Sequence, residues 1–321
     1  MSDALLEVQN LKLYYPVKVR QNVLRSETRY VKAVDDISFT VNKGETFGLV
    51  GESGCGKSTT GKTIVKLLRP TAGDILFEGK SIFARQEEGQ DLTTRIQIIF
   101  QDPYSSLDPR FTVGRCIAEP MVVHKTGTPQ QREERVRQLM KDVGLRPEHY
   151  TKYPHEFSGG QRQRIGVARA LALNPSLIVC DEPVSALDVS IQAQILNLMQ
   201  DLQKKYHLTY IFISHNLSVV KHLCDRIAVM YLGNMVEIAG KNDLFDRPAH
   251  PYTQALLDAI PIPDPDIPTM QEMLEGDVPS PMDPPAGCCF HTRCKKACPR
   301  CAQERPRLRE IAPGHLVACH F

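Results

Sequence analysis

The sequence predicts an α/β fold followed by a small, cysteine-rich C-terminal extension. Up to about residue 245, short apolar segments typical of buried strands alternate with amphipathic helix patterns. A glycine-rich segment at residues 51–58 lies between a strand pattern and a helix pattern, which is where phosphate-binding loops occur. From Pro248 onward the composition changes, because thirteen of the 23 prolines and six of the ten cysteines lie there. We therefore expect a boundary near residue 245.

The overall composition is that of an ordinary globular protein. The chain has 321 residues, of which 42% are hydrophobic and 24% are charged. Its formal net charge of +2 gives no strong positive field for bulk nucleic-acid binding. The sequence has no run of about 18 apolar residues, and its start, MSDALLEVQN, lacks the features of a secretory signal. We expect an intracellular protein whose membrane role depends on a partner.

The elements follow in order from apolar periodicity and from the residues that start and stop helices. A strand over 45–51 precedes a helix that Pro70 stops. The apolar face of that helix is formed by Ile64, Val65, Leu67 and Leu68. Further helices are predicted over 130–143, 158–173 and 190–206, and strands over 177–180 and 209–214. The segment 227–240 is typical of a hairpin that turns at Gly233–Asn234. A helical stretch at 253–260 and a proline-rich linker at 261–285 precede the cysteines.

The segment GESGCGKS at residues 51–58 fits the pattern G-x-x-x-x-G-K-S of a phosphate-binding loop. Its glycines allow the backbone to wrap a phosphate, and the N–H groups of the following helix supply partial positive charge. Lys57 is expected to reach the β- and γ-phosphates, and the Ser58 hydroxyl to hold Mg²⁺. Cys55 is interpreted as a small buried side chain.

Two carboxylates follow the apolar strand pattern in LIVCDE, at residues 177–182. Asp181 suits Mg²⁺, and the neighbouring Glu182 could accept a proton from an attacking water. A strand that ends in an acidic pair is common by itself. Its position about 120 residues after a phosphate-binding loop favours the functional interpretation.

A third motif, FSGGQRQR at residues 157–164, opens a helix with a serine and two glycines. Together with GESGCGKS and LIVCDE it resembles the signature of the ATP-binding cassette (ABC) family, and the resemblance covers roughly residues 4–245. Tyr15, after the first strand, matches the aromatic residue that stacks on adenine. Gln101, His215 and the segment 185–188 match the family's connecting glutamine, switch histidine and post-strand loop.

This resemblance implies a RecA-like core with an antiparallel β subdomain and a helical subdomain at about residues 102–172. It also implies head-to-tail pairing of two cassettes, so that the signature of one chain acts on the ATP of the other. The implied catalytic residues are Lys57, Gln101, Glu182 and His215. The implied nucleotide-binding residues are Tyr15, Gly51, Glu52, Ser53, Gly54, Cys55, Gly56, Lys57, Ser58, Thr59, Gln101, Ser158, Gly159, Gly160, Gln161 and Asp181. The implied ligands of Mg²⁺ are Ser58, Gln101 and Asp181.

The last part of the chain, residues 246–321, resembles the C-terminal extension of dipeptide, oligopeptide and nickel importer ATPases. The resemblance rests on HPYTQALLDAI, GCCF-HTRC and GHLVACHF. It implies a [4Fe–4S] cluster held by Cys288, Cys294, Cys301 and Cys319. Four thiolates also suit zinc, and their spacing does not choose between the metals. Cys289 and Cys298 are additional, and Cys298 is a possible substitute ligand.

The function predicted from these resemblances is ATP hydrolysis that powers peptide uptake. The expected partners are a second ABC ATPase, of the D type, two transmembrane permease subunits and an extracytoplasmic binding protein, with this chain as the F-type subunit. The permease would dock on the region from Gln101 to about Gly144, at the cytoplasmic face of the bacterial inner membrane. The alternative is an ABC ATPase that acts on nucleic acid through a zinc tail. The single cassette and near-neutral charge argue against that alternative.

Overall fold

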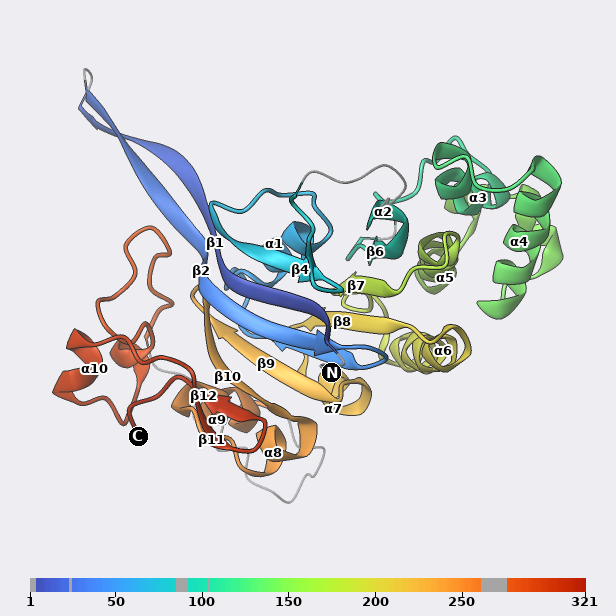
Figure 1. Cartoon of the computed structure of the whole chain (residues 1–321). Helices are drawn as coiled ribbons and strands as arrows, with labels where there is room; N and C mark the ends of the chain where they lie inside the picture. Colours follow the sequence, from blue (N-terminus) through green and yellow to red (C-terminus); the bar gives the residue numbers. More distant parts are fainter. Residues whose placement is uncertain (1–3, 23–24, 85–91, 103, 261–275) are drawn as a thin grey trace. The chain divides into compact units, whose positions relative to one another are not determined.

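The computed structural model describes residues 4–22, 25–84, 92–102, 104–260 and 276–321 (Figure 1). The chain divides into two compact units. The first contains the described parts of Met1–Asn42, Thr46–Ala84 and Ile213–Phe321, and the second those of Lys43–Glu45 and Arg85–Phe212. Residues after the predicted boundary at 245 thus lie in the same unit as the phosphate-binding segment, and the two-domain division remains a prediction.

The first unit contains a four-stranded antiparallel sheet of order β2-β1-β4-β5. Its strands are β1 (Ala4–Asn22), β2 (Arg25–Asn42), β4 (Ala72–Phe77) and β5 (Lys80–Ser81). β1 and β2 pair along their whole length as a long hairpin, which Figure 1 shows in dark blue. Leu6, Leu11 and Ile37 are fully buried, so one face of the hairpin contributes to the core.

Strands of the first unit also form part of a second, mixed sheet, in the order β11-β12-β10-β9-β3. They are β3 (Thr46–Val50), β9 (Arg226–Tyr231), β10 (Asn234–Gly240), β11 (Arg309–Ala312) and β12 (His315–Val317). β3 and β9 are parallel, and the pairs formed by β10, β11 and β12 are antiparallel. The C-terminal extension therefore adds two strands, β11 and β12, to the sheet that contains β3, the strand before the phosphate-binding loop.

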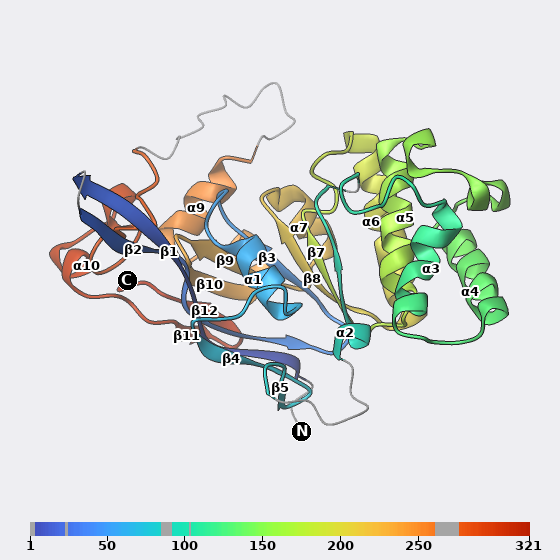
Figure 2. The ribbon, with the colours of Figure 1, turned by 90° about the horizontal axis from the view of Figure 1, so that it is seen from above.

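The helices of the first unit are short. They are α1 (Lys57–Ile64), α7 (Leu217–Leu223), α8 (Lys241–Asp246), α9 (Pro251–Asp258) and α10 (Pro299–Gln303), with a 3-10 turn, η3, at His291–Arg293. Figure 2 shows α9 beside β9 and the segment that leads into α1.

The second unit combines parallel strands with a group of helices. Its strands have the order β8-β7-β6 and are β6 (Ile96–Ile99), β7 (Leu177–Asp181) and β8 (Thr209–Ser214), of which the last two residues belong to the first unit. Its helices are α2 (Leu92–Arg95), α3 (Val113–Val123), α4 (Pro129–Asp142), α5 (Gly159–Leu171) and α6 (Val189–Tyr206), with 3-10 turns η1 (Pro147–Thr151) and η2 (Pro154–Glu156). Figures 1 and 2 show α3, α4 and α5 side by side. The α/β fold with an antiparallel sheet and a helical part confirms the predicted fold class.

Three details of the sequence prediction were wrong. The helix after the phosphate-binding loop ends at Ile64, because Lys66 takes a left-handed conformation, and so it stops well before Pro70. The hairpin turns at Leu232–Gly233, both with positive φ, since Asn234 already pairs with Tyr231. Tyr15 lies within β1, because β2 continues the pairing beyond it.

Two further points concern the limits of the described chain. Residues 261–275 of the predicted linker lie outside the described residues. Within the part of the chain that the structure describes, every helix is too short or too polar to cross the apolar core of a bilayer.

Candidate functional site

The phosphate loop, Gly51–Ser58, joins β3 to α1 in the first unit, and its backbone requires glycine at two positions. Gly51 and Gly56 have φ of 146° and 104°, a region that other residues rarely adopt. A Cβ atom on Gly51 would lie 2.1 Å from the carbonyl oxygen of Met230, and one on Gly56 would lie 2.1 Å from that of Ala33. Because backbone atoms cannot move away cheaply, no side chain fits there, and the loop takes the close-wrapped form that phosphate binding needs.

Lys57 is the buried cation of this loop. Its ammonium group donates hydrogen bonds to the carbonyl oxygens of Gly51 and Glu52, each at 2.8 Å. The lysine therefore lies along the loop at the start of α1, where Ser58 and Thr59 form the first turn with it. Cys55, within the loop, is buried, and burial raises the pKa of its thiol, which supports its interpretation as a packing residue.

The two tyrosines of β1 differ in exposure. The Tyr14 hydroxyl donates to the carboxylate of Asp35, and burial together with that carboxylate raises its pKa. The Tyr15 side chain is 38% exposed. Of the pair, Tyr15 thus has the ring that is accessible for stacking on a base.

The acidic pair lies at the end of β7 in the second unit. Asp181 is the last residue of the strand and is buried, while Glu182 follows it with a positive φ of 48°. The amide nitrogen of Gln101 donates to Glu182 Oε2 at 2.9 Å and approaches Ser185 Oγ at 3.4 Å. The structure therefore brings together Gln101 and Glu182, which are 81 positions apart.

His215 is exposed and lies directly after β8, in the first unit. The next residue, Asn216, caps α7 by accepting hydrogen bonds from the N–H groups of Ser218 and Val219, at 3.0 and 3.4 Å. The cap fixes where the chain turns from strand to helix, and so it fixes the position of the histidine at the strand end.

The signature segment forms the N-terminus of α5 with a capping box. The Ser158 hydroxyl accepts from the N–H of Gln161, and the Gln161 side chain accepts from the N–H of Ser158 at 3.1 Å. A Cβ on Gly160 would lie 2.5 Å from the Ile191 side chain of α6, so glycine permits the two helices to approach. The exposed Ser158 thus stands at a positive helix end, as a group that contacts phosphate would.

The four cysteines predicted as ligands, Cys288, Cys294, Cys301 and Cys319, line one small cavity. The thiol of Cys298 lies 3.6 Å from that of Cys301, whereas Cys289 accepts a hydrogen bond from Asn234 at 3.2 Å. Cys289 is thus engaged elsewhere, and Cys298 is adjacent to the predicted set. Among the described residues, no group of three or more His, Cys, Asp or Glu side chains has metal-binding geometry.

The sequence interpretation missed two residues that contact the phosphate loop. Arg293 of the extension binds the Glu52 carboxylate, and the Tyr252 hydroxyl accepts the Glu52 N–H at 2.9 Å. Tyr252 is part of the HPYTQALL motif, which could have drawn attention to it. Arg293 is part of the HTRC motif, but nothing in the sequence connects it to Glu52, which is 241 positions away.

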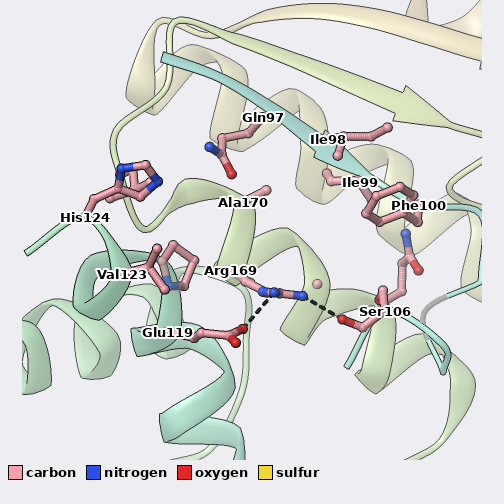
Figure 3. A pocket seen from close by; sticks show the side chains of 14 residues that line it. Gln97, Ile98, Ile99, Phe100, Ser106, Glu119, Val123, His124, Arg169 and Ala170 are labelled. Atoms are coloured by element: carbon pink, nitrogen blue, oxygen red, sulfur yellow. Dashed lines mark hydrogen bonds and ion pairs between the residues drawn. The ribbon is translucent and has the colours of Figure 1, made fainter. Parts of the chain in front are cut away.

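A pocket of about 310 Å³ opens between β6, α3 and α5 of the second unit (Figure 3). Its walls include Ile99, Phe100 and Val123, of which Val123 is 67% exposed. Arg169 of α5 lies across it, donating to the Ser106 carbonyl at 2.6 Å and to Glu119 at 2.7 Å (Figure 3). The pocket lies partly on the predicted docking region from Gln101 to Gly144.

Comparison with known proteins matches both parts of the chain. Residues 34–185 match the ABC transporter family, and residues 236–301 match the C-terminal region of oligopeptide/dipeptide transporters. The chain is 53% identical to the oligopeptide transport ATP-binding protein AppF of Bacillus subtilis, over 99% of this chain and 98% of that protein. It is 51% identical to a putative peptide import ATP-binding protein of Brucella ovis, over 98% of this chain and 97% of that one. Among solved structures it resembles the cassette MJ0796, seen as a dimer with ADP and Pi, with a TM-score of 0.63, 25% identity and coverage of 74% and 98%.

Proposed function

The chain belongs to the ABC transporter ATPases that carry the oligopeptide/dipeptide transporter C-terminal region, and on this basis we propose that it hydrolyses ATP to drive peptide import through a separate permease. The single observation that carries hydrolysis is the hydrogen bond from Gln101 to Glu182, which orients a carboxylate next to Asp181 at the end of β7. Peptide as cargo rests on the relatives, which are matched over nearly their whole length.

In this proposal ATP binds between the phosphate loop of one subunit and the signature of its partner. Lys57 and the loop amides hold the β- and γ-phosphates, and Tyr15 stacks on the adenine. Ser58, Gln101 and Asp181 would hold Mg²⁺, whose chemistry is to neutralise charge on the transferred phosphoryl group. The Ser158 hydroxyl and the N-terminus of α5 face the γ-phosphate of the partner's ATP.

The catalytic step is assigned to Glu182 and His215. Glu182 accepts a proton from the attacking water, and His215 orients that water and contacts the γ-phosphate. Gln101 orients the Glu182 carboxylate by a hydrogen bond. The same side chain would contact the γ-phosphate. Because the partner's signature faces the γ-phosphate, which ADP lacks, release of phosphate after hydrolysis would reopen the dimer.

The decisive experiment replaces Glu182 by glutamine in the complex with its permease. Turnover is expected to fall by about 10²–10⁴-fold, with ATP-bound dimers accumulating, because the general base is lost while ATP binding is retained. Glu310→Gln, an exposed glutamate of β11 outside the predicted docking region, is the control and should keep wild-type turnover. Near-normal hydrolysis by the Glu182→Gln variant would remove Glu182 from its role.

We assign the cysteine cavity to a [4Fe–4S] cluster, with zinc as the alternative metal. Two points support this proposal: Cys288, Cys294, Cys301 and Cys319 line one cavity, and four thiolates are the ligands of such a cluster. The cluster would stabilise the fold of this short extension. Protein purified without oxygen should contain about four iron and four sulfide per chain, and Cys294→Ser should lose both, whereas Cys289→Ser should keep them. One zinc in a colourless protein would refute the cluster.

The permease would bind at the pocket between β6, α3 and α5. An apolar wall that includes the exposed Val123 suits a protruding segment of a partner. Val123→Asp should abolish co-purification with the permease while ATP binding remains, and Val278→Asp, an exposed valine of the extension, should not. Retained co-purification of Val123→Asp would exclude this docking surface.

The second cassette would be a D-type paralogue, with a binding protein delivering peptide from outside the cell. With this composition the chain would be a peripheral subunit at the inner face of the membrane. Proteins that co-purify with it from solubilised membranes test the assignment, and two identical copies of this chain as the whole ATPase would contradict it.

A further inference from the structure

The phosphate loop and the cysteine-rich extension are joined by a two-pronged ion pair. Both terminal nitrogens of Arg293 lie 3.0–3.2 Å from the carboxylate oxygens of Glu52, the second residue of the loop. The Arg293 side chain is 6% exposed and that of Glu52 is 24% exposed, so the pair is largely removed from water. Burial by itself lowers the pKa of Arg293, but the hydrogen bonds and charges of Glu52 and Tyr231 together raise it. A paired contact of this kind defines the direction of the carboxylate.

Arg293 is itself held in place by packing of the extension. It ends η3, three residues after Phe290, which is fully buried against Tyr231 and Tyr252 with ring centroids 5.2 and 5.3 Å away. The guanidinium also lies over the Tyr231 ring, 5.9 Å from its centroid. The arginine is therefore presented to the loop by a rigid aromatic cluster that β9, α9 and the extension share.

The extension also holds the backbone of the same loop residue. The hydroxyl of Tyr252, in α9, accepts the N–H of Glu52 at 2.9 Å, and Lys57 donates to the Glu52 carbonyl. The side chain, N–H and carbonyl of Glu52 thus all have defined partners. Two of these three contacts come from residues beyond 250, outside the strand–loop–helix segment that forms the loop.

Charge gives the ion pair a second consequence. A carboxylate in a loop that receives polyphosphate would repel its ligand, and the repulsion is strong where water is excluded. Arg293 neutralises this carboxylate from the side of the extension. Arg293 immediately precedes Cys294. The fold of the cysteine-rich segment therefore determines whether the neutralising charge lies beside Glu52.

We propose that Arg293 is a positioning residue for nucleotide binding: through Glu52 it fixes the phosphate loop and cancels the loop's negative charge. The inference rests on the proposed ATPase function and extends it, because it makes nucleotide affinity depend on a residue of the C-terminal extension.

The test measures the Kd of the full-length chain for a fluorescent MgADP analogue, which requires no hydrolysis. Arg293→Gln should raise Kd by about tenfold or more, because the carboxylate is left unpaired beside the phosphates. Glu52→Gln/Arg293→Gln should return to within about threefold of wild type, since the repelling charge is gone. Arg300→Gln removes another arginine of the extension, one paired with exposed Glu304, and should leave Kd unchanged.

A purely structural role for Arg293 predicts different results. A Kd for Arg293→Gln within twofold of wild type, or a double variant as weak as the single one, overturns the proposal. If Arg293→Gln does not fold, Arg293→Lys replaces it, because lysine keeps the charge but loses the paired geometry. A raised Kd would then support the positioning role, and an unchanged Kd would overturn it.

In the assembled transporter, Arg293→Gln should raise KM for ATP while kcat stays within about threefold. A fall in kcat with unchanged KM would contradict a positioning role. The control against the proposed function is the wild-type chain. If that chain does not bind MgADP, the ATPase assignment fails, whereas failure of the variants alone to differ concerns only Arg293.

Discussion

Replacing Glu237 by alanine is expected to destabilise the first unit strongly. Glu237 lies in β10, is 0% exposed, and accepts three hydrogen bonds. The N–H groups of Ala249 and His250 bind it at 2.8 and 2.9 Å, and Nε2 of His315 binds it at 2.7 Å. One carboxylate therefore connects β10 to the start of α9 and to β12, both in the region that sequence reasoning treated as a separate extension.

The size of the effect follows from these contacts. Alanine leaves two backbone N–H groups and one ring N–H without their acceptor in a buried site. Each unsatisfied donor costs about 1–3 kcal/mol, so three donors at the lower end give a loss of about 3–5 kcal/mol. Glu310→Ala is the control, because Glu310 in neighbouring β11 is exposed and accepts one N–H, from Gly314 at 2.8 Å. Its cost should be below about 1 kcal/mol.

Thermal unfolding followed by circular dichroism checks the prediction. At about 2–4 °C per kcal/mol, the Glu237→Ala variant should melt roughly 10 °C below wild type and the Glu310→Ala variant within a few degrees. The Glu237→Ala variant should also expose the cysteine-rich segment to protease, because β12 loses the hydrogen bond between the His315 side chain and β10. Equal melting temperatures for the two variants would refute the view that Glu237 holds the extension to the sheet.

Two further predictions concern one glycine of the signature and one buried histidine. Gly160→Ala should lower the free energy of unfolding by about 1–3 kcal/mol and lower ATPase activity, because its Cβ would meet the Ile191 side chain at 2.5 Å. No described atom lies within 4 Å of a Cβ on Gly166, so Gly166→Ala, the control, should be neutral or stabilising. Equal urea midpoints for the two variants would contradict this. Burial lowers the pKa of His250 from 6.5 to about 4, so the unfolded chain takes up the proton first as pH falls through this window. The free energy of unfolding should therefore drop by about 3 kcal/mol between pH 6.5 and pH 4, and it should fall less steeply in the His250→Asn variant. Identical pH profiles of the urea midpoint for wild type and variant would show that the histidine is not responsible.

Much of the fold and of the nucleotide motifs could be predicted because the signals are local. Residues 130–143 show helical periodicity that ends at Gly144, and the structure has α4 over Pro129–Asp142, with a capping box at Thr128. The signal for the phosphate loop is equally local, because its glycines are needed for positive φ angles within eight consecutive residues. The roles of Glu182, His215 and the signature in catalysis remain predictions.

Other predictions failed at the boundaries of individual elements. Pro70 was expected to stop the first helix, yet Lys66 ends it earlier, and the hairpin turn at Leu232–Gly233 differs by one residue from the predicted one. Tyr15 was placed after a strand that in fact continues past it, because pairing with β2 supports the longer strand. The hydrophobic periodicity of a segment carries no information about the strand that will pair with it, and that pairing can lengthen or shorten the segment's strand.

The sequence by itself determined part of the order of strands and helices, the phosphate-loop motif and membership of a family, because each depends on neighbouring residues or on a recognisable string. Only the tertiary structure decided that the extension joins the sheet through β12, that Glu237 is buried among three donors, and that Arg293 reaches Glu52 across 241 positions. The physical reason is that ion pairs and buried hydrogen bonds act between atoms that meet in space, and the free energy they contribute comes from burial that folding alone creates.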